Sequence, residues 1–291
     1  MKVRMMNRLL VGVSILVLIS LASCFKTDDL INPLEQFKKE TDAVDAYLDE
    51  NGLTAQIDTG GYDLRYIIHE QGDGEKPGTE DVSLVEITGR VLGGSEFINE
   101  DSLHIALNSW IPGYQILLPY INEGGSMTMF IPSYYGYGQN QAFNGNVQEN
   151  STLILEVKLK KVLSQFEFEQ LLIDNYIEEN ELVAEIDSVY GLRYIIAGDG
   201  DGETYPTASD LVNVDYSGRL LSSDIEFDSN VAVDFNLQNL IQGWRILMPY
   251  VSEGGKITMF IPSKYGYGTT GSGTIPGNAT LIFEVRLNTV K

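Results

Sequence analysis

The sequence predicts an α+β protein in which an antiparallel sheet with helices occurs twice. The first observation is a repeat: residues 118–138 read LPYINEGGSMTMFIPSYYGYG, and residues 248–268 read MPYVSEGGKITMFIPSKYGYG. The second is an alternation of apolar and polar residues within each copy, which is typical of strands with one buried face. The third is a capped amphipathic segment ahead of each copy, which predicts a helix.

The size of the repeat fixes the number of domains. The chain has 291 residues, and a period near 130 is far longer than the ~20–50 residues of a solenoid repeat. It corresponds to a complete domain, so the sequence predicts a tandem duplication. The predicted boundaries are 1–23 for a signal peptide, 24–46 for a tether and the start of a helix, 47–162 for domain 1, 163–176 for a linker helix and 177–291 for domain 2.

Composition excludes several classes of function. Lys and Arg number 19 against 41 Asp and Glu, which gives a net charge of −22 and argues against nucleic-acid binding. One cysteine excludes an intramolecular disulfide and a cysteine-based zinc site. Two histidines, His69 and His104, argue against a histidine-based metal centre. The sequence therefore predicts neither a metal nor a cofactor, and it leaves the oligomeric state open.

The first residues are typical of a secretory signal. A basic start precedes the apolar run 9–19, and small residues precede Cys24. This arrangement resembles a bacterial lipoprotein signal, so Cys24 is expected to become a lipidated N-terminus that attaches the protein to a membrane. A signal-anchor helix with an incidental cysteine is the alternative. Phe25 is not the aspartate that retains some lipoproteins on the inner membrane, which favours the outer membrane of a cell envelope, facing the periplasm or the cell surface.

Helix signals precede both copies. In the first, Asn32 is a predicted N-cap, Pro33 occupies the first helical position and Asn51-Gly52 ends the pattern. In the second, Ser164 and Glu167 have the spacing of a capping box. Both helices are predicted to be linkers and spacers, and a role in dimerisation is the alternative.

Strand signals follow each helix. Met127, Met129 and Ile131 alternate with Thr128 and Phe130, and residues 281–288 alternate in the same way. One apolar stretch, 241–248, and its twin 111–118 break this pattern. Their spacing predicts a short helix on the concave side of the sheet.

Two motifs have the form of a binding site without its context. Residues 266–271 fit G-x-G-x-x-G, but turn signals flank them instead of a strand and a helix. Residues 199–203 are acidic, but the rest of a 12-residue calcium loop is absent. Both are predicted to be turns. The two histidines have no twins in the second copy, so no nucleophile–histidine set can be assembled.

The aromatic residues of the second copy occur in a characteristic order. The blocks are 214–218, Phe227-Asp228, 240–244, 253–255, 261–268 and 275–283. Together they resemble the FKBP-type peptidyl-prolyl cis/trans isomerases over about the last 100 residues. The resemblance implies two FKBP-like domains, each an antiparallel sheet curled around a short α-helix with an apolar pocket between them. It also implies proline-containing polypeptides as substrates.

The resemblance implies a role for each matching residue. Trp244 would form the pocket floor and Asp228 the one carboxylate at its edge. The Tyr267 hydroxyl would donate to a substrate carbonyl, and the Ile241 N–H to the carbonyl beside the proline. The implied catalytic set is Tyr216, Phe227, Asp228, Ile241, Trp244, Tyr267 and Phe283, and the implied substrate-binding set is Val233, Leu240 and Ile275.

The chemistry of the reaction suits these residue types. Amide resonance gives the peptide bond a rotation barrier of ~18–20 kcal/mol, so X–Pro bonds isomerise over roughly tens to hundreds of seconds. Water stabilises the charge-separated resonance form of the planar amide. A dry aromatic pocket removes that stabilisation, and placed donors favour the twisted transition state. No nucleophile, metal or titrating base is needed.

The first copy lacks part of this set. Ile87 replaces Tyr216, Ile98 replaces Asp228, Tyr114 replaces Trp244 and Leu155 replaces Phe283. The counterparts in domain 1 are Phe97, Ile111, Tyr114 and Tyr137. The sequence therefore predicts a degenerate domain 1 and a lipid-anchored isomerase that assists the folding of exported proteins, active mainly in domain 2. The alternative is a non-catalytic peptide-binding chaperone or interaction lipoprotein that uses the same cleft.

Overall fold

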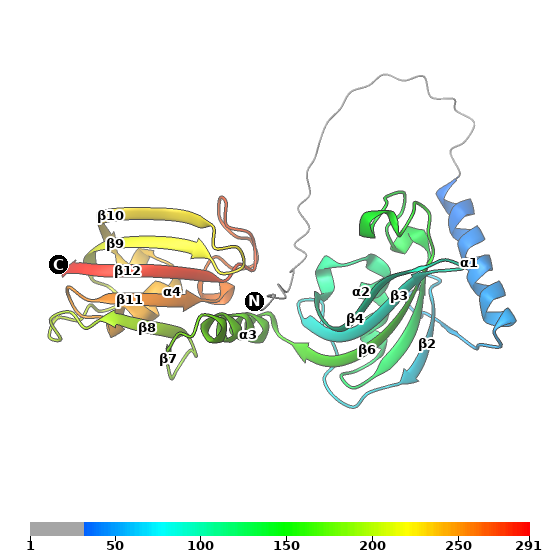
Figure 1. The fold of residues 1–291 in the computed structure, drawn as a ribbon, viewed down its shortest axis with the longest axis horizontal. Helices are drawn as coiled ribbons and strands as arrows, with labels where there is room; N and C mark the ends of the chain where they lie inside the picture. The colour runs from blue at the N-terminus through cyan, green and yellow to red at the C-terminus, as the bar shows by residue number, and fades with distance from the viewer. Residues whose placement is uncertain (1–31) are drawn as a thin grey trace, which may run out of the picture.

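The structure is a computed structural model, and it describes residues 32–291. The predicted signal peptide, Cys24 and most of the tether lie outside the described residues. Within 32–291 the chain forms two sheets of the same design (Figure 1).

Both sheets are six-stranded and antiparallel throughout. The first has the order β1-β2-β5-β6-β3-β4, and the second has the equivalent order β7-β8-β11-β12-β9-β10. This confirms the predicted α+β class. The strands of domain 1 are β1 (Gln56–Ile57), β2 (Arg65–Glu70), β3 (Val82–Val91), β4 (Glu96–Ala106), β5 (Ser126–Ile131) and β6 (Leu153–Leu163). Those of domain 2 are β7 (Glu185–Ile186), β8 (Arg193–Gly198), β9 (Leu211–Leu220), β10 (Glu226–Asn236), β11 (Lys256–Ile261) and β12 (Leu281–Val290).

Each domain has one long and one short α-helix. Single-turn 3₁₀ segments flank the short helix and lie in the loops that follow. The α-helices are α1 (Pro33–Glu50), α2 (Pro112–Leu117), α3 (Gln165–Glu179) and α4 (Gln242–Leu247). The 3₁₀ segments are η1 (Leu107–Ser109), η2 (Leu118–Tyr120), η3 (Ser133–Tyr135), η4 (Phe143–Gly145), η5 (Leu237–Asn239), η6 (Met248–Tyr250) and η7 (Ser263–Tyr265).

The long helices begin where the sequence predicts. The Asn32 side chain accepts a hydrogen bond of 3.0 Å from the Leu34 N–H, and Ser164 forms a complete capping box with Glu167. The predicted linker helix ends at residue 176, whereas α3 continues to Glu179. Asn180 is its C-cap.

The long helices pack on the outer faces of the sheets. Val44 of α1 is fully buried against Phe130 and Ile154, and Ile173 of α3 is fully buried against Phe260 and Ile282. Each helix, predicted as a linker or spacer, is therefore also packed against the sheet that follows it.

The short helices pack on the inner faces. A Cβ at Gly243 of α4 would lie 2.6 Å from Ile261 Cγ2, so only glycine permits this close approach between helix and strand. Met127, Met129 and Ile131 point to the same inner face in domain 1 and are buried, as their alternation predicts.

The outer strand of the second sheet is irregular. The pairing of β10 with β9 shifts register between Glu226 and Asp228, and again between Asn230 and Val233. Ala232 lies in the second shift with a φ of 53°, a left-handed conformation unusual for alanine. In domain 1, the pairing of β3 with β4 also shifts at two places. These are β-bulges, which bend an edge strand.

The two misleading motifs lie in turns. Residues 266–271 follow η7 without entering a helix, and 199–203 form a loop in which the Asp201 carboxylate accepts from two backbone N–H groups. Across residues 32–291 there is no group of three or more His, Cys, Asp or Glu side chains placed to hold a metal. No helix in that same range is long and apolar enough to cross a membrane.

Candidate active site

Trp244 lies at the centre of an aromatic cluster in domain 2. Its ring centroid is 5.3 Å from that of Phe283, 5.8 Å from Tyr216 and 6.1 Å from Phe235, all edge to face. Phe227 packs edge to face on Phe283 at 5.6 Å. Edge-to-face pairs are favourable beyond their burial, so the rings fix one another's orientation. We call these five residues and Tyr267 the aromatic site.

The sheet brings these rings together through its register. Phe283 of β12 lies opposite Gly218 of β9, and Phe227 is the second residue of β10, which pairs with β9 on its other side. A Cβ at residue 218 would lie 2.6 Å from Phe283 and 2.8 Å from Phe227. The glycine therefore leaves the space that the two rings fill.

Burial divides the aromatic site into a floor and a rim. Trp244 is 3% exposed and Phe283 is 4% exposed, whereas Tyr216, Phe227 and Tyr267 are half-buried. The predicted substrate-binding residues lie in the same cluster: Val233, Leu240 and Ile275. A half-buried aromatic rim around a buried aromatic floor is suited to binding an apolar ring.

One carboxylate lies at the rim. The Tyr216 hydroxyl donates a hydrogen bond of 2.6 Å to Asp228. Burial first, and then the charge of Asp228, raises the pKa of Tyr267. The Tyr267 hydroxyl therefore keeps its proton above the usual tyrosine range. It remains a donor at neutral pH.

A backbone donor lies at the start of the helix that carries Trp244. The Ile241 N–H, at the start of α4, donates to no backbone or side-chain acceptor within residues 32–291. The Tyr267 hydroxyl and this N–H are thus two hydrogen-bond donors on residues that pack in the same cluster as Trp244. All ten residues of the two predicted sets are brought together by the fold.

The fold adds one residue that the sequence reasoning missed. Phe235 of β10 packs on Tyr216 at 5.6 Å and on Trp244. It lies two positions after Val233, and residues two apart in a strand share a face. That spacing was the signal that could have found it.

Comparison with known proteins identifies the family. The family model described as FKBP-type peptidyl-prolyl cis-trans isomerase matches residues 73–160 and again residues 202–288. This chain belongs to that family. It carries two FKBP domains, and the family's activity is peptidyl-prolyl cis–trans isomerisation of proline-containing polypeptides.

Individual relatives match parts of the chain. The FKBP-type peptidyl-prolyl cis-trans isomerase FkpA of Buchnera aphidicola (subsp. Schizaphis graminum) is 33% identical over 171 residues, which cover 53% of this chain and 67% of that protein. FK506-binding protein 1 of Eremothecium gossypii is 42% identical over 95 residues, covering 30% of this chain and 82% of that protein. A crystal structure of FkpA from Escherichia coli has 30% identity and a TM-score of 0.36, and the match covers 45% of this chain and 65% of that one.

In the FKBP domain 1, a different residue occupies the position that Trp244 has in domain 2. Tyr114 of α2 replaces Trp244 and is fully buried, and Trp110 packs edge to face on it at 4.6 Å. Burial raises the pKa of Tyr114 far above the usual range, so its hydroxyl stays neutral. The other counterparts, Phe97, Ile111 and Tyr137, lie in the same cluster.

Domain 1 also places a ring of its own at the rim. Phe143 packs on Phe97 at 4.8 Å and on Tyr137 at 5.8 Å. The corresponding loop of domain 2 is shorter and carries Ser272 and Gly273, which have no ring. The space beside Phe97 and Tyr137 is thus filled by the chain itself.

The Phe143 loop is held in a strained shape. Phe143 has a φ of 50°, and Asn144 and Gly145 also have positive φ. The left-handed conformation costs a residue with a side chain roughly 1–2 kcal/mol. Paired hydrogen bonds of 3.0 and 3.2 Å between Ala142 and Val147 close the loop and hold this shape.

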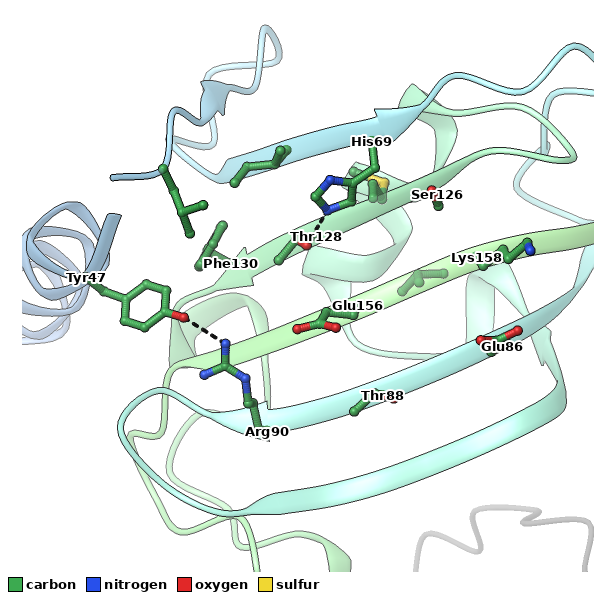
Figure 2. Close-up of a pocket in the computed structure, with 14 residues that line it drawn as sticks. Tyr47, His69, Glu86, Thr88, Arg90, Ser126, Thr128, Phe130, Glu156 and Lys158 are labelled. Carbon is green, nitrogen blue, oxygen red and sulfur yellow. Dashed lines mark hydrogen bonds between the residues drawn. The ribbon is translucent and has the colours of Figure 1, made fainter. Parts of the chain in front are cut away.

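A groove of about 440 Å³ lies elsewhere, on the outer face of the domain 1 sheet beside α1. Figure 2 shows His69 hydrogen-bonded to Thr128, and Arg90 donating to the Tyr47 hydroxyl, along its walls. The side chains are of mixed charge, with Glu86, Glu156 and Lys158 also lining it. It is open, and it contains none of the predicted site residues.

Proposed function

We propose that this FKBP-family chain isomerises prolyl bonds mainly with domain 2, that it is attached to a bacterial envelope membrane through Cys24, and that it assists the folding of exported proteins. The observation that supports a C-terminal active domain is the difference between the two centres. Domain 2 combines Trp244, Asp228 and Tyr267, whereas domain 1 has Tyr114 and Ile98 at the first two places and Phe143 over the third.

Substrate binding in this proposal begins with the proline ring. The ring packs over the floor formed by Trp244 and Phe283, between walls formed by Tyr216 and Phe227. Val233, Leu240 and Ile275 contact the flanking side chains of the polypeptide. Burying the ring and its amide removes water from the bond that must rotate.

Rotation is then favoured by loss of amide resonance. In dry surroundings the planar, charge-separated form loses the stabilisation that water gives it. The Tyr267 hydroxyl donates to a substrate carbonyl, and the Ile241 N–H donates to the carbonyl beside the proline. These donors hold the substrate on both sides of the twisting bond. They lower the barrier to the extent that they bind the twisted transition state more tightly than the planar ground state.

Asp228 acts at the rim in two ways. Its hydrogen bond fixes the Tyr216 ring, which packs on Trp244. Its negative charge also adds to the effect of burial in raising the pKa of Tyr267, whose hydroxyl is a donor at neutral pH. Neither role requires Asp228 to exchange a proton with the substrate.

The test of domain 2 activity uses Tyr267→Phe and Asp228→Asn in the full chain. We expect kcat/KM for a proline-containing peptide to fall about two- to tenfold in Tyr267→Phe, because one neutral hydrogen bond contributes roughly 0.5–1.5 kcal/mol. Asp228→Asn should lower it as well. A protease-coupled or NMR exchange assay measures the rate.

Tyr137→Phe is the matched control, since it removes the same hydroxyl from domain 1. It should leave kcat/KM unchanged. An equal fall in Tyr137→Phe would assign activity to both domains. A wild-type chain that binds the peptide without accelerating isomerisation would instead favour the non-catalytic chaperone.

The anchor is tested by Cys24→Ser. The wild-type chain should incorporate labelled fatty acid and sediment with membranes of the producing bacterium, because Cys24 is the only cysteine. The variant should lose the label and the membrane association. Protease added to intact cells then distinguishes a surface-facing from a periplasm-facing protein. A variant that sediments with membranes as before would refute lipid attachment as the anchor.

A further inference from the structure

A buried carboxylate joins α3 to the turn that precedes Tyr267. Glu169 of α3 is 1% exposed. It accepts hydrogen bonds from the Ser263 N–H, from the Ser263 hydroxyl at 2.6 Å and from the Gln165 side chain at 2.7 Å. Burial raises the pKa of Glu169, and the three donors oppose that effect. Burying an ionised carboxyl costs free energy of folding unless hydrogen-bond donors surround it, as they do here.

The same contacts occur in domain 1. Glu40 of α1 is 5% exposed and accepts from the N–H and the hydroxyl of Ser133, the latter at 2.7 Å. Gln36, four residues earlier, donates to it as Gln165 does to Glu169. The chain thus contains two equivalent Gln–Glu–Ser groups, one in each domain.

Ser263 is connected to Tyr267 through the turn itself. It begins η7, and its carbonyl accepts from the Gly266 N–H at 2.9 Å and from the Gly268 N–H at 2.9 Å. These two glycines are the neighbours of Tyr267 on either side. A displacement of Ser263 therefore moves the backbone on both sides of that tyrosine.

The helix that carries Glu169 is fixed to the sheet at a second place. Arg193 of β8 forms a two-point ion pair with Asp174 of α3, with N–O distances of 2.7 and 2.8 Å. Ile173 of the same helix packs against Phe260 and Ile282 on the outer face of the sheet. The helix is thus a rigid reference from which Glu169 can hold the turn.

We propose that Glu169 is a positioning residue that holds the Ser263 turn and thereby aims the Tyr267 hydroxyl at the substrate. The proposal rests on the proposed activity of domain 2. It assigns α3, which the sequence presents as a linker, a part in the geometry of the active site. In domain 1 the equivalent group holds a turn whose tyrosine is covered by Phe143.

The test compares Glu169→Gln with Glu40→Gln in the full chain. The glutamine keeps the shape of the side chain, but an NH2 replaces one of the two carboxylate oxygens and the charge is lost, so it cannot accept from the Ser263 N–H, the Ser263 hydroxyl and Gln165 at once. Because the variant acts by displacing the Tyr267 hydroxyl, we expect Glu169→Gln to lower kcat/KM by about two- to tenfold, up to the loss expected when Tyr267→Phe removes that hydroxyl. Glu40→Gln perturbs an equivalent buried group and should leave kcat/KM unchanged.

Amide hydrogen exchange separates positioning from general destabilisation. In Glu169→Gln the Gly266 and Gly268 amides should exchange faster, while those of the central strand β12 stay protected. Ser263→Ala is the milder variant: it keeps the backbone bond to Glu169, loses the hydroxyl bond and should give an intermediate fall in kcat/KM.

Two results would overturn the proposal. One is a folded Glu169→Gln chain with wild-type kcat/KM and wild-type exchange at Gly266 and Gly268. The other is an equal loss of kcat/KM in Glu40→Gln. A wild-type chain without turnover would refute the proposed activity instead, and faster exchange at the two glycines would then still show that Glu169 holds the turn.

Discussion

Replacing Trp244 by alanine should unfold domain 2 more readily than any other change in the aromatic site. The side chain is 3% exposed and contacts three other rings. Truncating a buried tryptophan costs about 3–5 kcal/mol, while a domain has a total stability of roughly 5–15 kcal/mol. Isomerase activity should fall to the uncatalysed rate, because the floor under the proline ring is removed.

Tyr114→Ala is the matched control for Trp244→Ala. It truncates the fully buried residue at the same position of α2, so it should destabilise domain 1 and spare turnover. Denaturant unfolding should show two transitions, with a different one shifted in each variant. Trp244→Phe, which keeps an aromatic floor, should fold and retain part of the activity. Wild-type turnover in Trp244→Ala would contradict the role of this residue.

Gly218→Ala should disable domain 2 by overpacking. The new methyl group would lie 2.6 Å from Phe283 and 2.8 Å from Phe227, closer than carbon atoms pack. Forcing a methyl group into a packed core costs about 1–3 kcal/mol. Since both neighbours are rings of the aromatic site, kcat/KM should fall with stability.

Gly198→Ala provides the comparison for Gly218→Ala. Gly198 lies in β8 of the same sheet, and a methyl group there would meet its nearest neighbour at an ordinary 3.8 Å. Alanine is therefore expected to leave stability and turnover near the wild-type level. Crystals of Gly218→Ala should show displaced Phe227 and Phe283 rings. Undisplaced rings with unchanged turnover would refute the packing explanation.

Local signals account for the parts of the fold that the sequence predicts. Asn32 and the Ser164–Glu167 pair are helix starts that act within a few residues, so they can be recognised without the fold. The alternation at Met127–Ile131 gives the buried face for the same reason. The residues of the aromatic site other than Phe235 were predicted because they occur in a distinctive order along the chain.

Contacts between distant segments account for what was missed. Glu169 and Ser263 are 94 positions apart, and a glutamate in a helix gives no local sign that it is buried. The shape of the Phe143 loop depends on a left-handed backbone at a bulky residue, which local preferences disfavour. A comparison of the two copies would have offered one clue, because Gln36, Glu40 and Ser133 have counterparts in Gln165, Glu169 and Ser263.

The irregular outer strands have a consequence for how the chain is made. Two similar sheets joined in one chain can exchange strands while they fold, and this misassembly is characteristic of tandem domains. A flat, long outer strand would invite such pairing. Here β10 is bent at two places, one of them at Ala232, and the opposite borders end in the two-residue strands β1 and β7. We expect these borders to resist pairing with a neighbouring sheet, so that each copy completes its own fold.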